Sequence, residues 1–210
     1  MTKWTDPQVA PEHYDRSYDH RRRFVSYWNQ VDQVLRSEPQ VLLEVGIGNG
    51  FVSRYLRHLG LELRTVDLDE RLGPDVVASV TDLPFDDDSF DVACCFETLE
   101  HLPWEQFPVA LRELKRIARR RVLISLPDVT PCLRLRLGLR PTKYAIDLSR
   151  DWVRGKTPEH VFDGQHYWEI GARGTGLPVV QQVIEQTGLR ITEVHRDAED
   201  PYHRFFGCDV

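Results

Sequence analysis

The sequence predicts an α/β fold built on a mostly parallel sheet. Short aliphatic runs, at 41–45, 62–66, 75–79, 91–96 and 121–126, alternate with segments whose apolar residues recur at helical spacing. The length and aliphatic content of these runs suit strands that are buried on both faces. Alternation of strand and helix is typical of a parallel sheet in an α/β layer fold.

Helices are expected over 51–59, 107–117 and 177–187, where apolar residues recur on one helical face. The link from Asp67 to Asp75 is too short for a full crossover helix. Two further runs, 189–195 and 203–209, are separated by "RDAEDPY", which is short enough for an antiparallel hairpin.

Length, net charge and cysteine count limit the classes of function that the chain can have. With 210 residues the chain fits a single domain, and its net charge of -6 argues against a general nucleic-acid or membrane-surface binder. The four cysteines form no CxxC pair, so we expect no disulfide and no bound metal. No apolar stretch resembles a signal peptide or a membrane span, which predicts a cytoplasmic protein.

The segment "VLLEVGIGNGF" (41–51) joins the first strand to a helix through Gly46, Gly48 and Gly50. A dinucleotide fingerprint needs its third glycine at position 51, where this chain has Phe51, and no phosphate-binding GKS or GKT follows. Glu44 would also repel a pyrophosphate. The turn therefore favours a ligand with an ammonium or hydroxyl group.

Two acids follow the next strands. Asp67 ends the second strand, 21 residues after Gly46, where a carboxylate can accept both hydroxyls of a ribose. Asp82 follows the third strand, where it could accept from an adenine amino group while the backbone of Leu83 contacts the ring.

In order and spacing, "LLEVGIGNG", "TVDLD", "TDLPFDDDSFDVACCFETLEHL" and "LRELKRIARRRVLISLP" resemble class I S-adenosylmethionine-dependent methyltransferases of the type 11 small-molecule group. The resemblance implies a Rossmann-like three-layer sandwich whose seven-stranded sheet ends on an antiparallel strand. It implies S-adenosylmethionine as cofactor. The expected cofactor residues are Glu44, Gly46, Gly48, Gly50, Asp67, Leu68, Asp82, Leu83 and Glu97. The sequence departs from the family pattern in two places: the link after Asp67 is shortened, and the turn before the fifth strand is "ARRRV" where the family commonly has glycines.

His101 follows the fourth strand at the edge where such sheets bind ligands. It is a candidate general base, or it positions the following helix. Methyl transfer from a sulfonium needs mainly in-line alignment and exclusion of water, so a base is not obligatory.

Candidate acceptor contacts lie beyond residue 127. The segment 134–156 is locally basic, and Arg134 and Arg136 are candidates for a lid that receives an anionic acceptor; a solvated face is the alternative. His166 and Trp168 are candidates for the acceptor pocket, although aromatic residues more often fill the core. The HxxE pair at 166–169 lacks a third metal ligand in evident register.

Near the N-terminus, Tyr14, Tyr18 and Arg22 recur at four-residue spacing, which places them on one face of an expected helix. Because such a helix often closes over the cofactor in the resembled family, Tyr18 and Arg22 are expected to shield the sulfonium and meet the methionine carboxylate. An ordinary docked helix is the alternative.

Together these features predict a single methyltransferase domain, 1–210, acting on a small-molecule acceptor, as a monomer or homodimer. We divide it into an N-terminal helical cap (1–38), a cofactor-binding core (39–127), an acceptor-side insertion or lid (128–175) and a closing helix with hairpin (176–210). The alternatives are a nicotinamide-dependent oxidoreductase and a non-catalytic binding or interaction protein.

Overall fold

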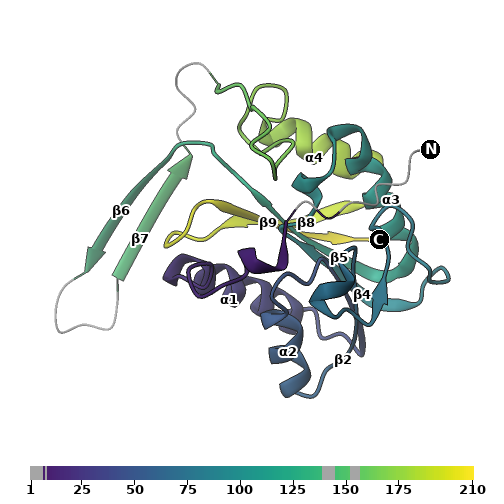
Figure 1. The fold of residues 1–210 in the computed structure, drawn as a ribbon. Helices are drawn as coiled ribbons and strands as arrows, with labels where there is room; N and C mark the ends of the chain where they lie inside the picture. The colour runs from purple at the N-terminus through teal and green to yellow at the C-terminus, as the bar shows by residue number, and fades with distance from the viewer. Residues whose placement is uncertain (1–6, 8, 139–144, 152–156) are drawn as a thin grey trace.

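The computed structural model describes residue 7 and residues 9–138, 145–151 and 157–210, except for the side chains of 134–138 and 145–150. Its centre is a seven-stranded sheet in the order β3-β2-β1-β4-β5-β9-β8 (Figure 1). The strands are β1 (Val41–Val45), β2 (Glu62–Asp67), β3 (Val76–Val77), β4 (Phe90–Phe96), β5 (Ala118–Pro127), β8 (Arg190–Arg196) and β9 (His203–Asp209). Neighbours from β3 to β5 pair in parallel, whereas β9 is antiparallel to both β5 and β8. The predicted mostly parallel sheet with an antiparallel last strand is confirmed.

Helices cover both faces of this sheet. The longer helices are α1 (Arg21–Arg36), α2 (Phe51–His58), α3 (Phe107–Ile117) and α4 (Leu177–Gln186). Short 3-10 helices are η1 (Pro11–His13), η2 (Glu70–Leu72), η3 (Leu99–His101) and η4 (Trp104–Gln106). As expected, only the single turn η2 stands between β2 and β3.

Successive strand residues divide the core between the two faces, because side chains alternate along a strand. Leu42 and Cys94 pack with the buried residues of α1 and α2. Leu43 and Cys95 pack with those of α3 and α4 on the other face. The two cores produce the predicted three-layer arrangement, with the ligand-facing edge at the carboxyl ends of β1, β2 and β4.

The expected helix around Tyr14 and Tyr18 is wrong. Oδ1 of Asp15 accepts hydrogen bonds from the backbone N–H of Ser17, 2.7 Å away, and from that of Tyr18, so a local turn replaces the helix. Helix α1 begins only at Arg21, with His20 as its N-cap.

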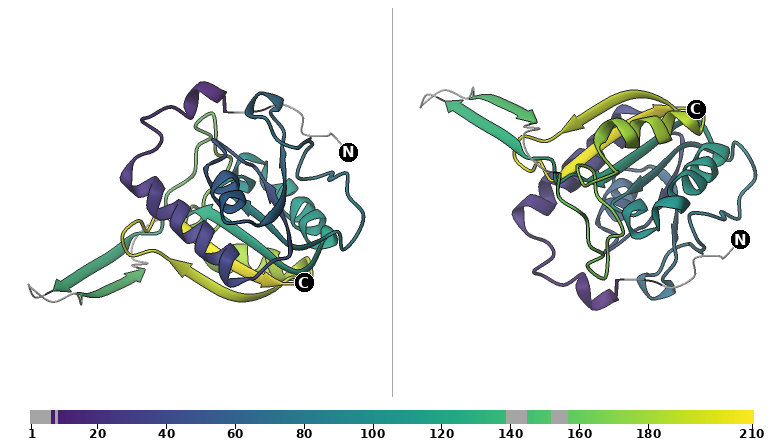
Figure 2. Two further views of the ribbon diagram at one scale, coloured as in Figure 1. Left: turned by 90° about the horizontal axis from the view of Figure 1, so that it is seen from below. Right: turned by 90° about the horizontal axis from the view of Figure 1, so that it is seen from above.

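A second, two-stranded sheet was not expected from the sequence. Strands β6 (Cys132–Gly138) and β7 (Ala145–Asp151) form an antiparallel hairpin that projects away from the main sheet (Figures 1 and 2). The buried Asp128 near the start of the hairpin pairs with Arg204 at 2.6 Å, and Asp151 pairs with Arg196 and Arg204, both at 2.7 Å. Within the described residues, no helix is long and apolar enough to cross a membrane.

The turn after β1 generates a stability prediction. Gly46 has φ +80°, and a Cβ there would lie 2.0 Å from Oγ1 of Thr98. Gly60 has a similar φ of +87° with nothing within 4 Å of the added Cβ. Gly60→Ala should therefore cost only the left-handed backbone penalty, about 1–2 kcal/mol. Gly46→Ala should cost clearly more in chemical denaturation, and equal losses in the two variants would contradict the close contact with Thr98.

Candidate cofactor and acceptor site

A cavity of about 150 Å³, open to solvent, lies at the carboxyl ends of β1, β2 and β4. Its walls come from the turn after β1, the end of β2, the loop after β3 and the start of the segment after β4. The N-terminal segment forms the remaining wall. The cavity is lined by many of the expected cofactor residues, namely Tyr18, Glu44, Gly46, Gly48, Asp67, Leu68 and Glu97, and by His101.

The glycine turn brings backbone close to the cavity. Gly46 and Gly48 both have positive φ, and the N–H of Gly46 donates to the carbonyl of Val66 at 2.8 Å. A Cβ on Gly48 would lie 3.4 Å from the ring of Tyr14, which covers the turn. Gly50 does not line the cavity: it is the left-handed N-cap of α2.

Glu44 is an acid buried within β1, with 3% of its surface exposed. Burial raises the pKa of its carboxyl to about 8, although the Ser53 hydroxyl favours the charged form. Its Oε2 has no hydrogen-bond partner among the described residues. A cationic group in the cavity would supply the missing partner, in agreement with the ammonium contact that the resemblance implies.

Asp67 is held rigidly at the end of β2. Its Oδ2 accepts from the N–H of Ile47 at 2.8 Å, and its Oδ1 accepts from the N–H of Asp69 at 2.9 Å. Burial raises the pKa of this carboxyl despite those bonds. Each oxygen retains a second lone pair, so the carboxylate can accept from a ribose diol in the cavity.

The structure places Asp82 and Leu83, the expected adenine contacts, outside the first cavity. Asp82 is exposed, and neither residue lines the cavity. The N–H of Leu83 already donates to Oε2 of Glu113 at 3.0 Å, so it is not directed at a ligand ring. Because β3 ends at Val77, earlier than predicted, the residues of this loop that line the cavity are Ala78, Ser79 and Val80.

The N-terminal segment lies over the cavity, but with a different cation from the one expected. Arg22 is exposed, whereas Arg23 lines the cavity and places its guanidinium carbon 4.4 Å from the centre of the Tyr18 ring. Asn49 attaches the segment to the glycine turn by donating from Nδ2 to Oδ1 of Asp19 at 2.9 Å. Helix α1 begins after its N-cap His20, and the residue of its first turn that faces the cavity is then Arg23 and not Arg22.

A second, smaller cavity adjoins the first and is strongly polar. The two cavities share Val9, Tyr14, Tyr18, Arg23, Glu97 and His101. The remaining residues of the second cavity are His13, Glu100, Gln165, His166 and Tyr202. His166, a candidate acceptor contact, therefore lines the second cavity. The side chains of Arg134 and Arg136 lie outside the described part of the structure.

Trp168 is not an acceptor contact. It is 3% exposed, donates from Nε1 to the carbonyl of Leu102 at 3.1 Å, and packs against Trp104 and Phe107. The alternative that it fills the core is therefore correct. Its neighbour in sequence, His166, reaches the second cavity because the loop turns at Asp163, whose Oδ1 accepts from the N–H of His166 at 2.8 Å.

Three ionisable groups, Glu97, Glu100 and His101, line the second cavity. Burial and the charge of the neighbouring His166 together lower the pKa of His101 to about 4, which favours the neutral ring. The backbone of Glu97 is left-handed, with φ of 49°. Burial favours the neutral form of its carboxyl, but the ion pair with His203, at 2.9 Å, keeps the pKa of Glu97 below its usual value. Burial and the charge of Glu97 raise the pKa of Glu100 well above its usual range.

Comparisons with known proteins agree with this geometry. Residues 43–126 match the type 11 methyltransferase family model, described as a methyltransferase domain. Similar solved structures include an S-adenosylmethionine-dependent methyltransferase from Mesorhizobium loti (14% identity, TM-score 0.59, covering 88% of this chain and 97% of that one). Magnesium protoporphyrin IX methyltransferase from Synechocystis, solved with bound S-adenosylhomocysteine, has 15% identity and a TM-score of 0.61, covering 97% and 89%.

A third similar structure is 1,6-didemethyltoxoflavin-N1-methyltransferase from Burkholderia thailandensis, with 17% identity, a TM-score of 0.55 and coverage of 99% and 93%. A search of curated proteins found no match. The chain has the class I S-adenosylmethionine-dependent methyltransferase fold. Residues 43–126, which carry the motifs quoted from the sequence, are similar to the type 11 methyltransferase family.

The ion pair behind the site predicts a pH-dependent stability. Burial would lower the pKa of His203, but Glu97 and Asp200 raise it to about 9 in the folded chain. Since this exceeds the ordinary value of 6.5, the pair stabilises the fold fully below about pH 6.5 and the contribution is lost as pH rises through 9. The unfolding free-energy difference between the unmodified chain and His203→Gln should fall by on the order of 2–3 kcal/mol from pH 6 to pH 10. A difference independent of pH in urea titrations would contradict the charged pair.

Proposed function

We propose that this protein transfers a methyl group from S-adenosylmethionine to a small-molecule acceptor that occupies the second cavity. The observation that carries the proposal is the junction of the two cavities. Tyr14, Tyr18, Arg23, Glu97 and His101 line both, so a donor in the first cavity and an acceptor in the second would meet there. The family match over 43–126 supports methyl transfer as the reaction.

The residues of the first cavity fit this cofactor. Gly46 and Gly48 line the first cavity with bare backbone, which the methionine part of the cofactor can approach closely. Glu44 offers a buried carboxylate to the ammonium group. Asp67 offers two rigidly held oxygens to the ribose hydroxyls.

When bound, S-adenosylmethionine supplies an electrophilic methyl group on a sulfonium: the acceptor lone pair forms the new bond, the carbon–sulfur electron pair stays on sulfur, and the acceptor releases a proton. The chain aligns the acceptor and excludes water, which are the main requirements of this reaction. At the junction of the two cavities, Tyr14 and Tyr18 form the wall that aligns the acceptor and excludes water. His101, with a pKa of about 4, is a weak proton acceptor and serves better to position the acceptor.

The acceptor class follows from the second cavity. Its lining of histidines, acids and tyrosines suits a polar molecule with hydroxyl or carboxylate groups. An anionic acceptor that contacts the basic segment 134–156 is part of the proposal, as are the four-part division of the chain and its cytoplasmic location. The neighbours from Synechocystis and Burkholderia are named for a porphyrin and a toxoflavin precursor, which shows that this fold accepts such small molecules.

The cofactor site is tested by comparing Asp67→Ala with Asp82→Ala. Asp67 lines the first cavity, whereas Asp82 is exposed outside it. Isothermal titration with S-adenosylhomocysteine should show at least a tenfold weaker affinity for Asp67→Ala, since two hydrogen bonds to a charged group are lost. Asp82→Ala should bind as the unmodified chain does. The reverse order would restore Asp82 as a cofactor contact.

Turnover is tested by incubating the protein with S-adenosylmethionine labelled in its methyl group and a metabolite extract. A labelled small molecule should form, and its identification names the acceptor. Titration with NAD on the same preparation is the control for the oxidoreductase alternative. Tight NAD binding without a response to S-adenosylhomocysteine would overturn the proposed function, and cofactor binding without label transfer would favour a non-catalytic protein.

A further inference from the structure

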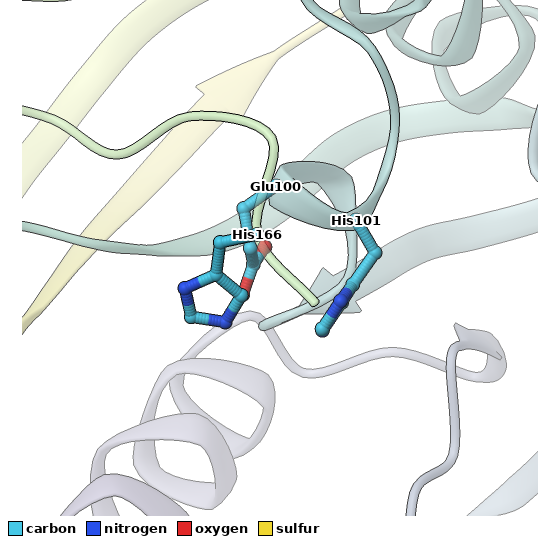
Figure 3. Close-up of side chains that lie close together, drawn as sticks. All are labelled: Glu100, His101 and His166. Carbon is cyan, nitrogen blue, oxygen red and sulfur yellow. The ribbon is translucent and has the colours of Figure 1, made fainter. Parts of the chain in front are cut away.

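Glu100, His101 and His166 form a cluster in the second cavity. One ligand atom from each side chain lies within 4.8 Å of the other two. Glu100 and His101 come from η3, and His166 comes from the loop before Trp168. Figure 3 shows the three side chains extending toward the same side, that of the N-terminal segment. Two imidazoles and a carboxylate are a ligand set that divalent transition metals favour.

The hydrogen bonds of the two histidines assign the proton to the same nitrogen of each ring. Nδ1 of His101 lies 3.0 Å from the carbonyl oxygen of Gln165, and a carbonyl only accepts, so Nδ1 carries the proton. Nδ1 of His166 lies 2.9 Å from Oε1 of Glu169 and donates to that carboxylate. In the neutral rings the lone pair is therefore on Nε2. Donation from the other nitrogen to a carbonyl or a carboxylate is the usual support of a metal-binding histidine.

Glu100 supplies a second, independent indication. It is 1% exposed, and neither of its carboxylate oxygens has a hydrogen-bond partner among the described residues. The charged form of a buried carboxyl without a partner is costly, so such a group either stays protonated or pairs with a cation, which would displace the proton. The positive charge of Arg23, which lines the same cavity, acts on Glu100, but the guanidinium lies over the Tyr18 ring and donates no hydrogen bond to either carboxylate oxygen. The carboxylate is thus open to a cation bound between the two histidines.

We propose that Glu100, His101 and His166 bind a divalent first-row transition-metal cation. Ligand atoms around such a cation lie about 3.0–3.4 Å apart when metal–ligand bonds are about 2.1 Å long. The ligand atoms of the three side chains now lie within 4.8 Å of one another, so each atom has to move by about 1 Å toward the centre of the cluster when the cation binds. The proposal revises the expectation that no metal is bound. In the HxxE pair at 166–169, His166 is the ligand and Glu169 is its supporting carboxylate.

The role of the cation rests on the proposed function. The cluster borders both cavities through His101, so a hydroxyl of the acceptor can bind the cation beside the methyl donor. Coordination lowers the pKa of a bound hydroxyl, which releases its proton to solvent and leaves an oxygen nucleophile at neutral pH. That oxygen forms the bond to the methyl group. The low basicity of His101 does not prevent this reaction, because His101 binds the cation and is not needed as a general base.

The test is titration calorimetry of the full-length chain with Zn²⁺, with Co²⁺ absorption as a spectroscopic readout of coordination. One Zn²⁺ per chain should bind, and Co²⁺ should develop visible ligand-field bands. Glu100→Gln and His166→Ala should each weaken Zn²⁺ binding at least tenfold. His58→Ala, which removes an exposed histidine near the end of α2, is the matched control and should bind Zn²⁺ unchanged.

Titration of the same samples with S-adenosylhomocysteine separates the two proposals. Each variant should retain cofactor affinity within about twofold, which also shows that it is folded. Failure to bind Zn²⁺ by a chain that still binds S-adenosylhomocysteine would overturn the metal site and leave the proposed function intact. Equal Zn²⁺ affinity in all four proteins would also overturn it, because the cation would then be bound elsewhere. Zn²⁺ binding that requires Glu100 and His166, without any response to S-adenosylhomocysteine, would support the metal site and overturn the proposed function.

Discussion

The close approach of Gly46 to Thr98 is the constraint on which the rest of the site depends. Strands β1 and β4 are parallel neighbours, so their carboxyl ends emerge side by side and the two following segments compete for the same space. The absence of a side chain at Gly46 resolves this competition: Thr98 occupies the place a Cβ would take. The first cavity opens beside this contact, and η3 follows it directly, which carries Glu100 and His101 to the second cavity.

The site concentrates buried acids, and their charges are compensated unequally. Glu97 has a partner within the protein, because His203 on β9 forms an ion pair with it. Among the described residues, no hydrogen bond reaches Oε2 of Glu44 or either carboxylate oxygen of Glu100, and Oε1 of Glu97 also lacks one. Burying such groups lowers stability, so their presence at the carboxyl ends of neighbouring strands is characteristic of a site whose ligands complete the charge balance. A ligand ammonium group near Glu44 and a metal cation near Glu100 would do so in the two cavities.

The N-terminal segment joins these two halves. It contributes Tyr14, Tyr18 and Arg23 to both cavities, and Asn49 attaches it to the glycine turn through Asp19. One continuous piece of chain thus forms part of the wall of both cavities. The β6–β7 hairpin, by contrast, projects away from the main sheet and is held near its base by Asp128, Asp151 and two arginines of the closing hairpin.

Local patterns in the sequence determined the alternation of strands and helices, the glycine turn and the position of Asp67, because each depends on residues close together in the chain. Only the tertiary structure decided which side chains face the cavities. The hydrogen bond from Leu83 to Glu113 spans 30 residues and removes a contact that the sequence favoured. Arg23 replaces Arg22 because the helix begins later than its periodicity indicated. Sequence spacing cannot show that His166 lies beside His101, since the loop that carries it is placed by packing of Trp168 against η4 and α3.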